Sequence, residues 1–140
     1  MADDKGPAEI ETPEVKKSFD PKMGKLASEK LAASLNSAVA AAKGIKVVSK
    51  ASAKEKGFQI KARITELTLD DKKGLLSIKA EIEVNTLPGP NLSRAVKGSS
   101  GFDGVNMKKL DKDVADLVTE MMKKTGPAVT KALEDKLTEM

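Results

Sequence analysis

The 140-residue chain contains no Cys, His, Trp or Tyr, and its only aromatic residues are three Phe. Without Cys, disulfides, thiolate metal sites and Cys nucleophiles are excluded. Without His, the chain lacks the commonest general base near neutral pH and the commonest ligand of transition metals. We therefore predict no catalytic residues, no metal site and no cofactor, and we expect a protein that binds rather than an enzyme.

Arginine is also scarce, because only Arg63 and Arg94 are Arg among the 25 basic residues, and the net charge is +4. In residues 1–20, three Lys and six acidic residues give −3, whereas in residues 21–56, eight Lys and two Glu give +6. Lysine is a strongly hydrated point charge, whereas the planar guanidinium of arginine is better suited to bidentate hydrogen bonds with phosphates and base edges. The charge pattern therefore favours diffuse attraction of anions over specific reading of nucleic acid.

Long hydrophobic runs are missing as well. No run of 18 apolar residues occurs, so we expect no membrane span, and no apolar signal-peptide region follows Met1. The length suits one domain with a core of Leu, Ile, Val, Ala and Met. We predict a mostly flexible acidic N-terminal segment over residues 1–19 that ends in a short strand or a docked segment, followed by a single α+β domain over residues 20–140.

Two long helices are predicted from the spacing of apolar residues. Asp20 suits an N-cap and Pro21 the first helical position, and Gly44 suits the end of the helix that follows. A second helix is predicted from Met107 to Lys124, after which Gly126-Pro127 breaks or kinks a helical run that continues to the end of the chain.

The strands are predicted from alternation of apolar and polar residues. They are Ile45–Ser49, Phe58–Leu69, Leu76–Val84 and a weaker Leu92–Gly98. Alternation slips near Thr65-Glu66, which predicts a β-bulge in an otherwise regular hairpin. We expect an antiparallel sheet of three to four strands with the two long helices packed on one face.

A glycine-rich stretch, Gly98–Gly104, separates the last predicted strand from the second helix. Backbone N–H groups of such a stretch can bind phosphate at a helix start. The spacing of Gly98, Gly101 and Gly104 matches neither the dinucleotide fingerprint nor the P-loop. The pattern favours a loose linker.

Two groups of carboxylates are candidate sites. Asp113, Asp116 and Glu120 share one side of the second helix, but neighbouring lysines favour a solvated surface with local ion pairs over a cation site. Glu81 and Glu83 fall on the solvent side of the hairpin by alternation, where carboxylates make poor acid–base catalysts at neutral pH. Neither group predicts catalysis.

The proline-containing loop over 85–91 is a predicted recognition element, because stiff loops on rigid hairpins commonly bind partners. Its predicted binding residues are Leu87, Pro88, Gly89, Pro90 and Asn91. The exposed edges of the sheet are a second candidate, since an edge can accept a strand from a protein partner or from a second copy of the chain.

Two other kinds of binding stay open. The lysines of the first helix and its flanks would attract nucleic acid or an anionic surface in a salt-sensitive way, although aromatic stacking platforms are missing. The predicted anion-binding residues are Lys22, Lys25, Lys30, Lys43, Lys46 and Lys50. An apolar ligand, such as a lipid, carried between helices and sheet is the other alternative.

The order of the segments carries a resemblance. The series "LASEKLAASLNSAVAAAKGIKVVSK", "GFQIKARITELTLDD" and "LLSIKAEIEV", followed by an Ala/Lys-rich terminal helix, resembles the small envelope domains of the TolB N-terminal type, which include lipoproteins that assist transport or cell-wall machinery. The resemblance implies a helix before a short strand, an antiparallel hairpin and a last helix, and it carries over no functional residue. It also implies a bacterial periplasmic or outer-membrane location, reached through an export signal.

From these observations the leading hypothesis is a non-catalytic binding or assembly module of the bacterial cell envelope. It would recognise a protein partner through a sheet edge or the 85–91 loop.

Overall fold

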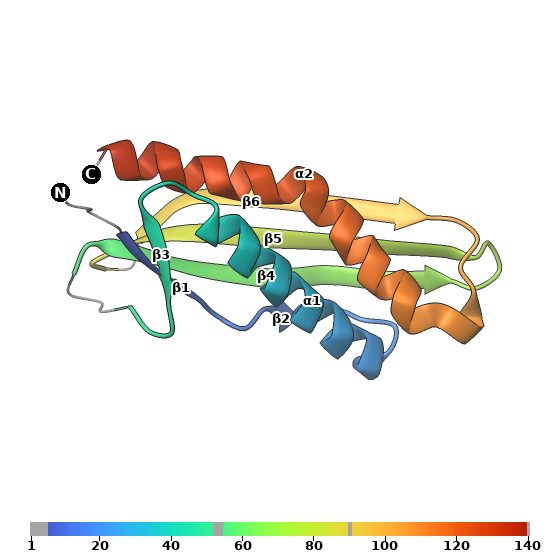
Figure 1. The fold of residues 1–140 in the computed structure, drawn as a ribbon. Helices are drawn as coiled ribbons and strands as arrows, with labels where there is room; N and C mark the ends of the chain where they lie inside the picture. The colour runs from blue at the N-terminus through green and yellow to red at the C-terminus, as the bar shows by residue number, and fades with distance from the viewer. Residues whose placement is uncertain (1–5, 52–54, 90, 140) are drawn as a thin grey trace.

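The computed structural model describes residues 6–51, 55–89 and 91–139. The elements within them are β1 (Gly6–Ile10), β2 (Glu14–Val15), α1 (Pro21–Ala40), β3 (Ile45–Val48), β4 (Gly57–Asp70), β5 (Leu75–Leu87), β6 (Asn91–Phe102), the short 3-10 helix η1 (Met107–Lys109) and α2 (Leu110–Glu139). Both long helices lie on one face of a single sheet (Figure 1), which confirms the predicted α+β class.

The sheet has six strands within the described residues, in the order β3-β1-β4-β5-β6, with β2 also pairing with β4. β1 runs parallel to both β3 and β4, and β2 is parallel to β4. The pairs β4–β5 and β5–β6 are antiparallel. The prediction of an antiparallel sheet of three to four strands is therefore wrong, because the N-terminal strands add a parallel half to it.

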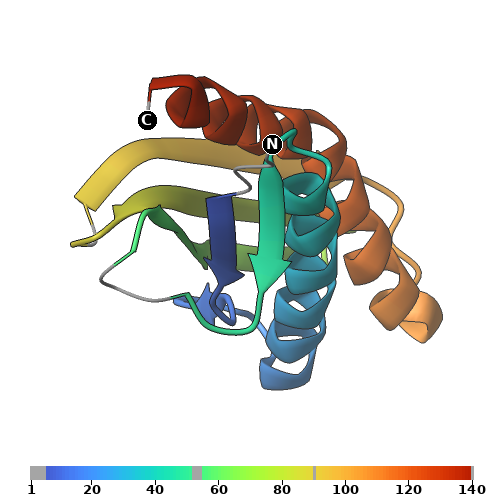
Figure 2. The ribbon, with the colours of Figure 1, turned by 60° about the vertical axis from the view of Figure 1, so that its left-hand side comes forward.

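The acidic segment before α1 runs alongside β4 (Figure 2). Ala8 pairs with Phe58 and Val15 with Ile64, and Ser18 bridges to Leu67. Within the segment predicted to be mostly flexible, over residues 1–19, residues 6–10 and 14–15 form strands of the sheet. Short parallel strands escape prediction because their partners lie far away in the sequence.

The central hairpin agrees with its prediction and is longer. β4 and β5 pair from Gly57–Leu87 to Asp70–Leu75, and the register shifts between Ile64 and Glu66, where the bulge was predicted. Alternate residues of both strands are buried under the helices. The hairpin thus supplies much of the core floor.

Helix α1 begins at the predicted cap. Asp20 Oδ1 accepts hydrogen bonds from the backbone N–H groups of Lys22, at 2.8 Å, and Met23, at 3.1 Å. The helix is joined to the N-terminal segment by Ser28, whose hydroxyl donates to the Pro13 carbonyl oxygen at 2.8 Å. After the helix, Gly44 adopts a φ of +83° in the turn into β3, a conformation that favours glycine.

Helix α2 continues through Pro127 as one 30-residue helix, and Figure 1 shows that its direction changes along its length. Proline removes one backbone donor and bends a helix rather than ending it here. Close contact with α1 supports this region, because the Thr130 hydroxyl donates to the Ala38 carbonyl oxygen at 2.7 Å.

β6 extends to Phe102, so the predicted loose linker over 98–104 is largely strand. Gly98 has a packing role: a Cβ placed on it would lie 2.3 Å from Thr125 Oγ1 of α2. The glycine therefore lets the helix approach the strand closely, and alternation was obscured because Gly98 and Gly101 carry no side chains.

Candidate functional site

The long edge of the sheet is β6. Among the residues that the structure describes, it pairs with β5 alone and ends the strand order, while β3 forms the other edge. All five residues from Asn91 to Ala95 are exposed, and exposed residues then alternate with partly buried ones to Phe102. An edge strand of 12 residues presents a row of backbone N–H and C=O groups that another strand can use.

The predicted recognition loop leads directly into this edge. Asn85 and Leu87 belong to β5, and Asn91 is the first residue of β6. Leu87 is only 5% exposed, because strand β5 carries its side chain into the structure. Pro88 and Gly89 are exposed, and Pro90 lies outside the described residues.

Local hydrogen bonds define the turn between the strands. The Thr86 hydroxyl donates to the Asn91 carbonyl oxygen at 3.3 Å, and Asn91 Nδ2 donates to the Pro88 carbonyl oxygen at 3.4 Å. The two features that the sequence proposed separately, the loop and a sheet edge, therefore form one continuous surface.

The sheet face opposite the helices is polar and, within the described residues, no helix covers it. Arg63 bridges two carboxylates of β5 there: one guanidinium nitrogen bonds Glu81 and the other bonds Glu83 at 3.0 Å. The hydrogen bond to Glu83 raises the pKa of Arg63 above its ordinary value, although partial desolvation opposes it, and the negative charges of Glu83 and Glu81 contribute further. The clamp joins β4 to β5 and partly offsets the charge of two acids that alternation had placed on this face.

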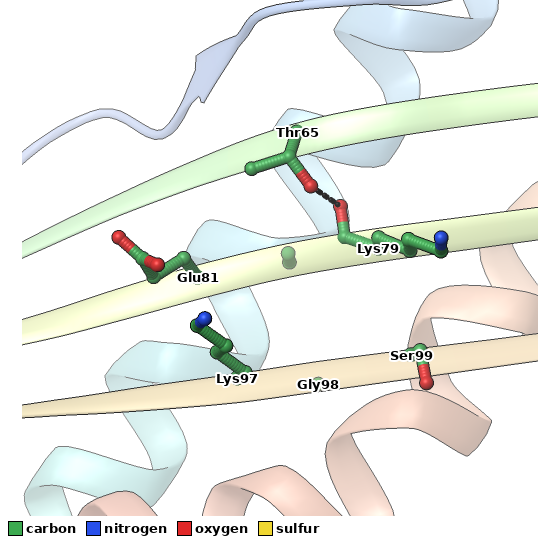
Figure 3. A pocket seen from close by; sticks show the side chains of 7 residues that line it. Thr65, Lys79, Glu81, Lys97, Gly98 and Ser99 are labelled. Atoms are coloured by element: carbon green, nitrogen blue, oxygen red, sulfur yellow. Dashed lines mark hydrogen bonds between the residues drawn. The ribbon is translucent and has the colours of Figure 1, made fainter.

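A shallow hollow of about 380 Å³ lies on this face beside the clamp (Figure 3). β6 contributes Lys97 and Ser99 to it, and β5 contributes Lys79. At the bulge in β4, the Thr65 hydroxyl donates to the Lys79 carbonyl oxygen at 3.1 Å. The hollow therefore extends the polar surface across three strands as far as the β6 edge.

A second hollow, of about 230 Å³, opens between the end of β6 and the first half of α2. Its apolar part is formed by Phe102 and Leu117, and its lining includes the carboxylates of Asp113, Asp116 and Glu120. Helical spacing had placed these three acids on one side of α2. Their position next to the end of β6 could not be seen in the sequence, because the tertiary structure brings strand and helix together.

The six lysines proposed for anion binding are all exposed. Lys22, Lys25 and Lys30 lie on α1, and the other three lie at or beyond its far end, in and around β3. A helix rises ~1.5 Å per residue, so Lys22 and Lys43, which lies just beyond the end of α1, are roughly 30 Å apart. The structure thus spreads these charges along α1 and around β3 and does not gather them into one compact site.

Within the described residues, no group of three or more Asp, Glu, His or Cys side chains is placed to hold a metal ion. Among these residues, the two groups with a raised pKa are cations held by carboxylates, Arg63 and Lys123. The hydrogen bond to Glu120 raises the pKa of Lys123. None of the helices in the described portion is long and apolar enough to cross a membrane.

Neither a scan against protein-family models nor a search of curated proteins finds a match. Solved structures do match. The hypothetical protein CT253 from Chlamydia trachomatis aligns with a TM-score of 0.58 at 10% identity, over 93% of this chain and 96% of that chain. A neuraminyllactose-binding hemagglutinin homolog from Helicobacter pylori aligns with a TM-score of 0.54 at 11% identity, over 100% and 93%.

The PelC dodecamer from Paraburkholderia phytofirmans aligns with a TM-score of 0.51 at 12% identity, over 87% of this chain and 89% of that chain. At such low identity these likenesses show a shared fold. The chain therefore has the fold of these bacterial proteins over nearly its whole length.

Proposed function

We propose that this chain is a non-catalytic binding and assembly module that recognises a protein through the β6 edge and the turn that leads into it. The observation that carries the proposal is the exposed 12-residue edge strand. Strand addition at such an edge supplies backbone hydrogen bonds for affinity, and the side chains beside it supply specificity.

The neighbourhood of the edge supports this assignment. Polar side chains flank β6 on the open face, including Lys97 and Ser99, and the exposed turn at Pro88 and Gly89 extends the surface. Leu92, at the start of the strand, is 60% exposed and is one of the few large hydrophobic residues in that state. A strand added at this edge would cover this side chain.

The shared fold gives the proposal further support. One protein with this fold, PelC, is a dodecamer, and another is named as a homolog of a binding protein, a hemagglutinin. We also place the module in the bacterial cell envelope, at the periplasm or outer membrane, on the strength of the sequence resemblance to envelope domains of the TolB N-terminal type.

A site-specific photo-crosslinker tests the proposal. Benzoylphenylalanine replaces Ser99 on β6 in one variant, Pro88 in the turn in a second, and Lys30 on α1 in a control; all three positions are exposed. After irradiation of cells that express the chain at native levels, mass spectrometry identifies the adducts. We expect defined protein adducts from Ser99 and Pro88 and none of the same identity from Lys30.

Adducts of equal identity and yield from all three positions would contradict the proposal, as would their absence from both β6-side positions. Cell fractionation of the same material tests the location, which a purely cytoplasmic signal would overturn.

A further inference from the structure

We propose that the partner strand at this edge is β6 of a second copy of the chain, paired antiparallel about a twofold axis through Gly98. The inference rests on the proposed function, since it names the partner of the same edge. Two antiparallel copies would join two six-stranded sheets into one, with the helices of both copies on the same side. A twofold interface of this kind requires a surface that complements itself.

The sequence of β6 selects the register. When the two strands pair so that the helices of both copies lie on the same side of the sheet, directly opposite residues must point to the same face. A register centred on Lys97 would place the two Lys97 ammonium groups opposite each other, which is unfavourable. Centring on Gly98 instead places Lys97 opposite Ser99, and Arg94 opposite Phe102, of the other copy.

The charges along the edge then match. Arg94 pairs with the fully buried Val84, so its side chain leaves β6 on the helix-covered face. In the proposed register it meets the far end of the other β6, where Phe102 lines the hollow that also holds Asp113 and Asp116. The basic end of each strand therefore faces the acidic end of the other, and the twofold axis forms this contact twice.

Arg94 is free to make this contact. Its only ion pair among the described residues is with Asp135, at 3.9 Å, and both side chains are about half exposed (52% and 51%). Exposed ion pairs of this kind contribute little. Asp116 enters no ion pair within the described part of the chain. Each copy exchanges one weak internal contact for one contact with the other copy, which costs little.

Glycine at the twofold axis places no side chain between the two copies. Gly98 has no side chain, and on its helix-covered side Thr125 already occupies the space where a Cβ would lie. Two glycines opposite each other allow close approach of the backbones. The residues on both sides of the axis, Lys97 and Ser99, form a polar cross-strand pair on the open face.

Charge exchange tests the inference on the full-length chain by sedimentation at several concentrations. We expect a reversible dimer for the unmodified chain. Arg94→Glu should weaken it about tenfold or more, because it sets like charges against each other at both contacts. Arg94→Glu combined with Asp116→Lys should bring the dissociation constant of the dimer back to within about threefold of that of the unmodified chain. Lys30→Glu, an equal charge change on α1, should leave the dimer unchanged.

Cysteine pairing tests the register, since the chain has no Cys of its own. Lys97→Cys and Ser99→Cys proteins are oxidised separately and as a mixture. We expect a disulfide-linked heterodimer to form faster in the mixture than the homodimer forms in either single protein. Faster linkage of Lys97→Cys to itself would overturn the Gly98-centred register.

A chain that stays monomeric at every concentration, or a dimer insensitive to Arg94→Glu, would overturn the inference. That result is distinguishable from failure of the proposed function. Crosslinking from Ser99 to a different protein would uphold binding at the edge while excluding a second copy as its occupant.

Discussion

The two edges of the sheet differ in length, in burial and in what holds them. β3 has four residues, and its first, Ile45, is only 7% exposed. β6 has 12 residues, of which the first five are all exposed. A short edge anchored in the core offers little to a partner strand, whereas a long exposed edge offers a continuous template.

The difference follows from the helices. β3 comes directly after α1 and the Gly44 turn, so the chain returns onto the core at once. β6 is joined to α2 through a longer connection, and α2 covers its inner face around Gly98. The sheet therefore has one edge tied into the core and one long exposed edge, and three sets of substitutions test that difference.

The largest effect is expected at the structural edge. Ile45→Ala should destabilise the fold by about 3 kcal/mol, because it removes a buried side chain and leaves a cavity. Leu92→Ala at the start of β6 should change the free energy of unfolding by no more than about 0.5 kcal/mol, since Leu92 is 60% exposed. Urea denaturation of both variants measures these free energies of unfolding. Equal losses of stability in the two variants would contradict the difference between the edges.

A smaller effect is expected where α2 holds β6. Gly98→Ala should cost about 2 kcal/mol, because its Cβ would overlap the buried Thr125. Gly126→Ala is the matched control on α2: its Cβ would lie 3.7 Å from Ala38 Cβ, an ordinary contact, so removing a helical glycine should stabilise by about 0.5 kcal/mol. Thermal unfolding that shows equal effects would contradict the close approach at Gly98.

The smallest effect is expected between the edges, at the clamp. Arg63→Met should destabilise by about 1 kcal/mol, because it leaves Glu81 and Glu83 without their shared partner on a partly hydrated face. Since the clamp raises the pKa of Arg63, its contribution is present at neutral pH and is lost only as pH rises through that raised value. Unfolding at pH 7 in low and high salt measures it, and a loss as large as that for Ile45→Ala would contradict a surface role.

Local signals predicted the parts of the fold whose partners are near in sequence. The cap at Asp20, the β4–β5 hairpin and its bulge are each specified by a few neighbouring residues, and the structure confirms them. β1 was missed because a five-residue strand containing Gly6 and Pro7 carries little alternation. Its parallel pairing with β3 and β4 depends on contacts that no local pattern encodes.

The candidate site was predicted in pieces. Alternation and the proline-containing turn indicated an edge and a loop, but Gly98 and Gly101 hid the second half of β6. The hollow formed by Phe102 and Asp116 was not predicted, because it joins a strand and a helix whose contact depends on how α2 packs. Which elements lie next to each other depends on how they pack around the shared core, and composition alone does not describe that packing.

Side-chain inventory and short-range periodicity established that Cys and His are missing and which segments become helices and hairpin, because both can be assessed from neighbouring residues. Only the tertiary structure decided which strand is left at the edge and which charges lie beside it. The reason is that burial of the helices on one face fixes the strand order. That order leaves β6 with backbone groups that no neighbouring strand within the described residues satisfies.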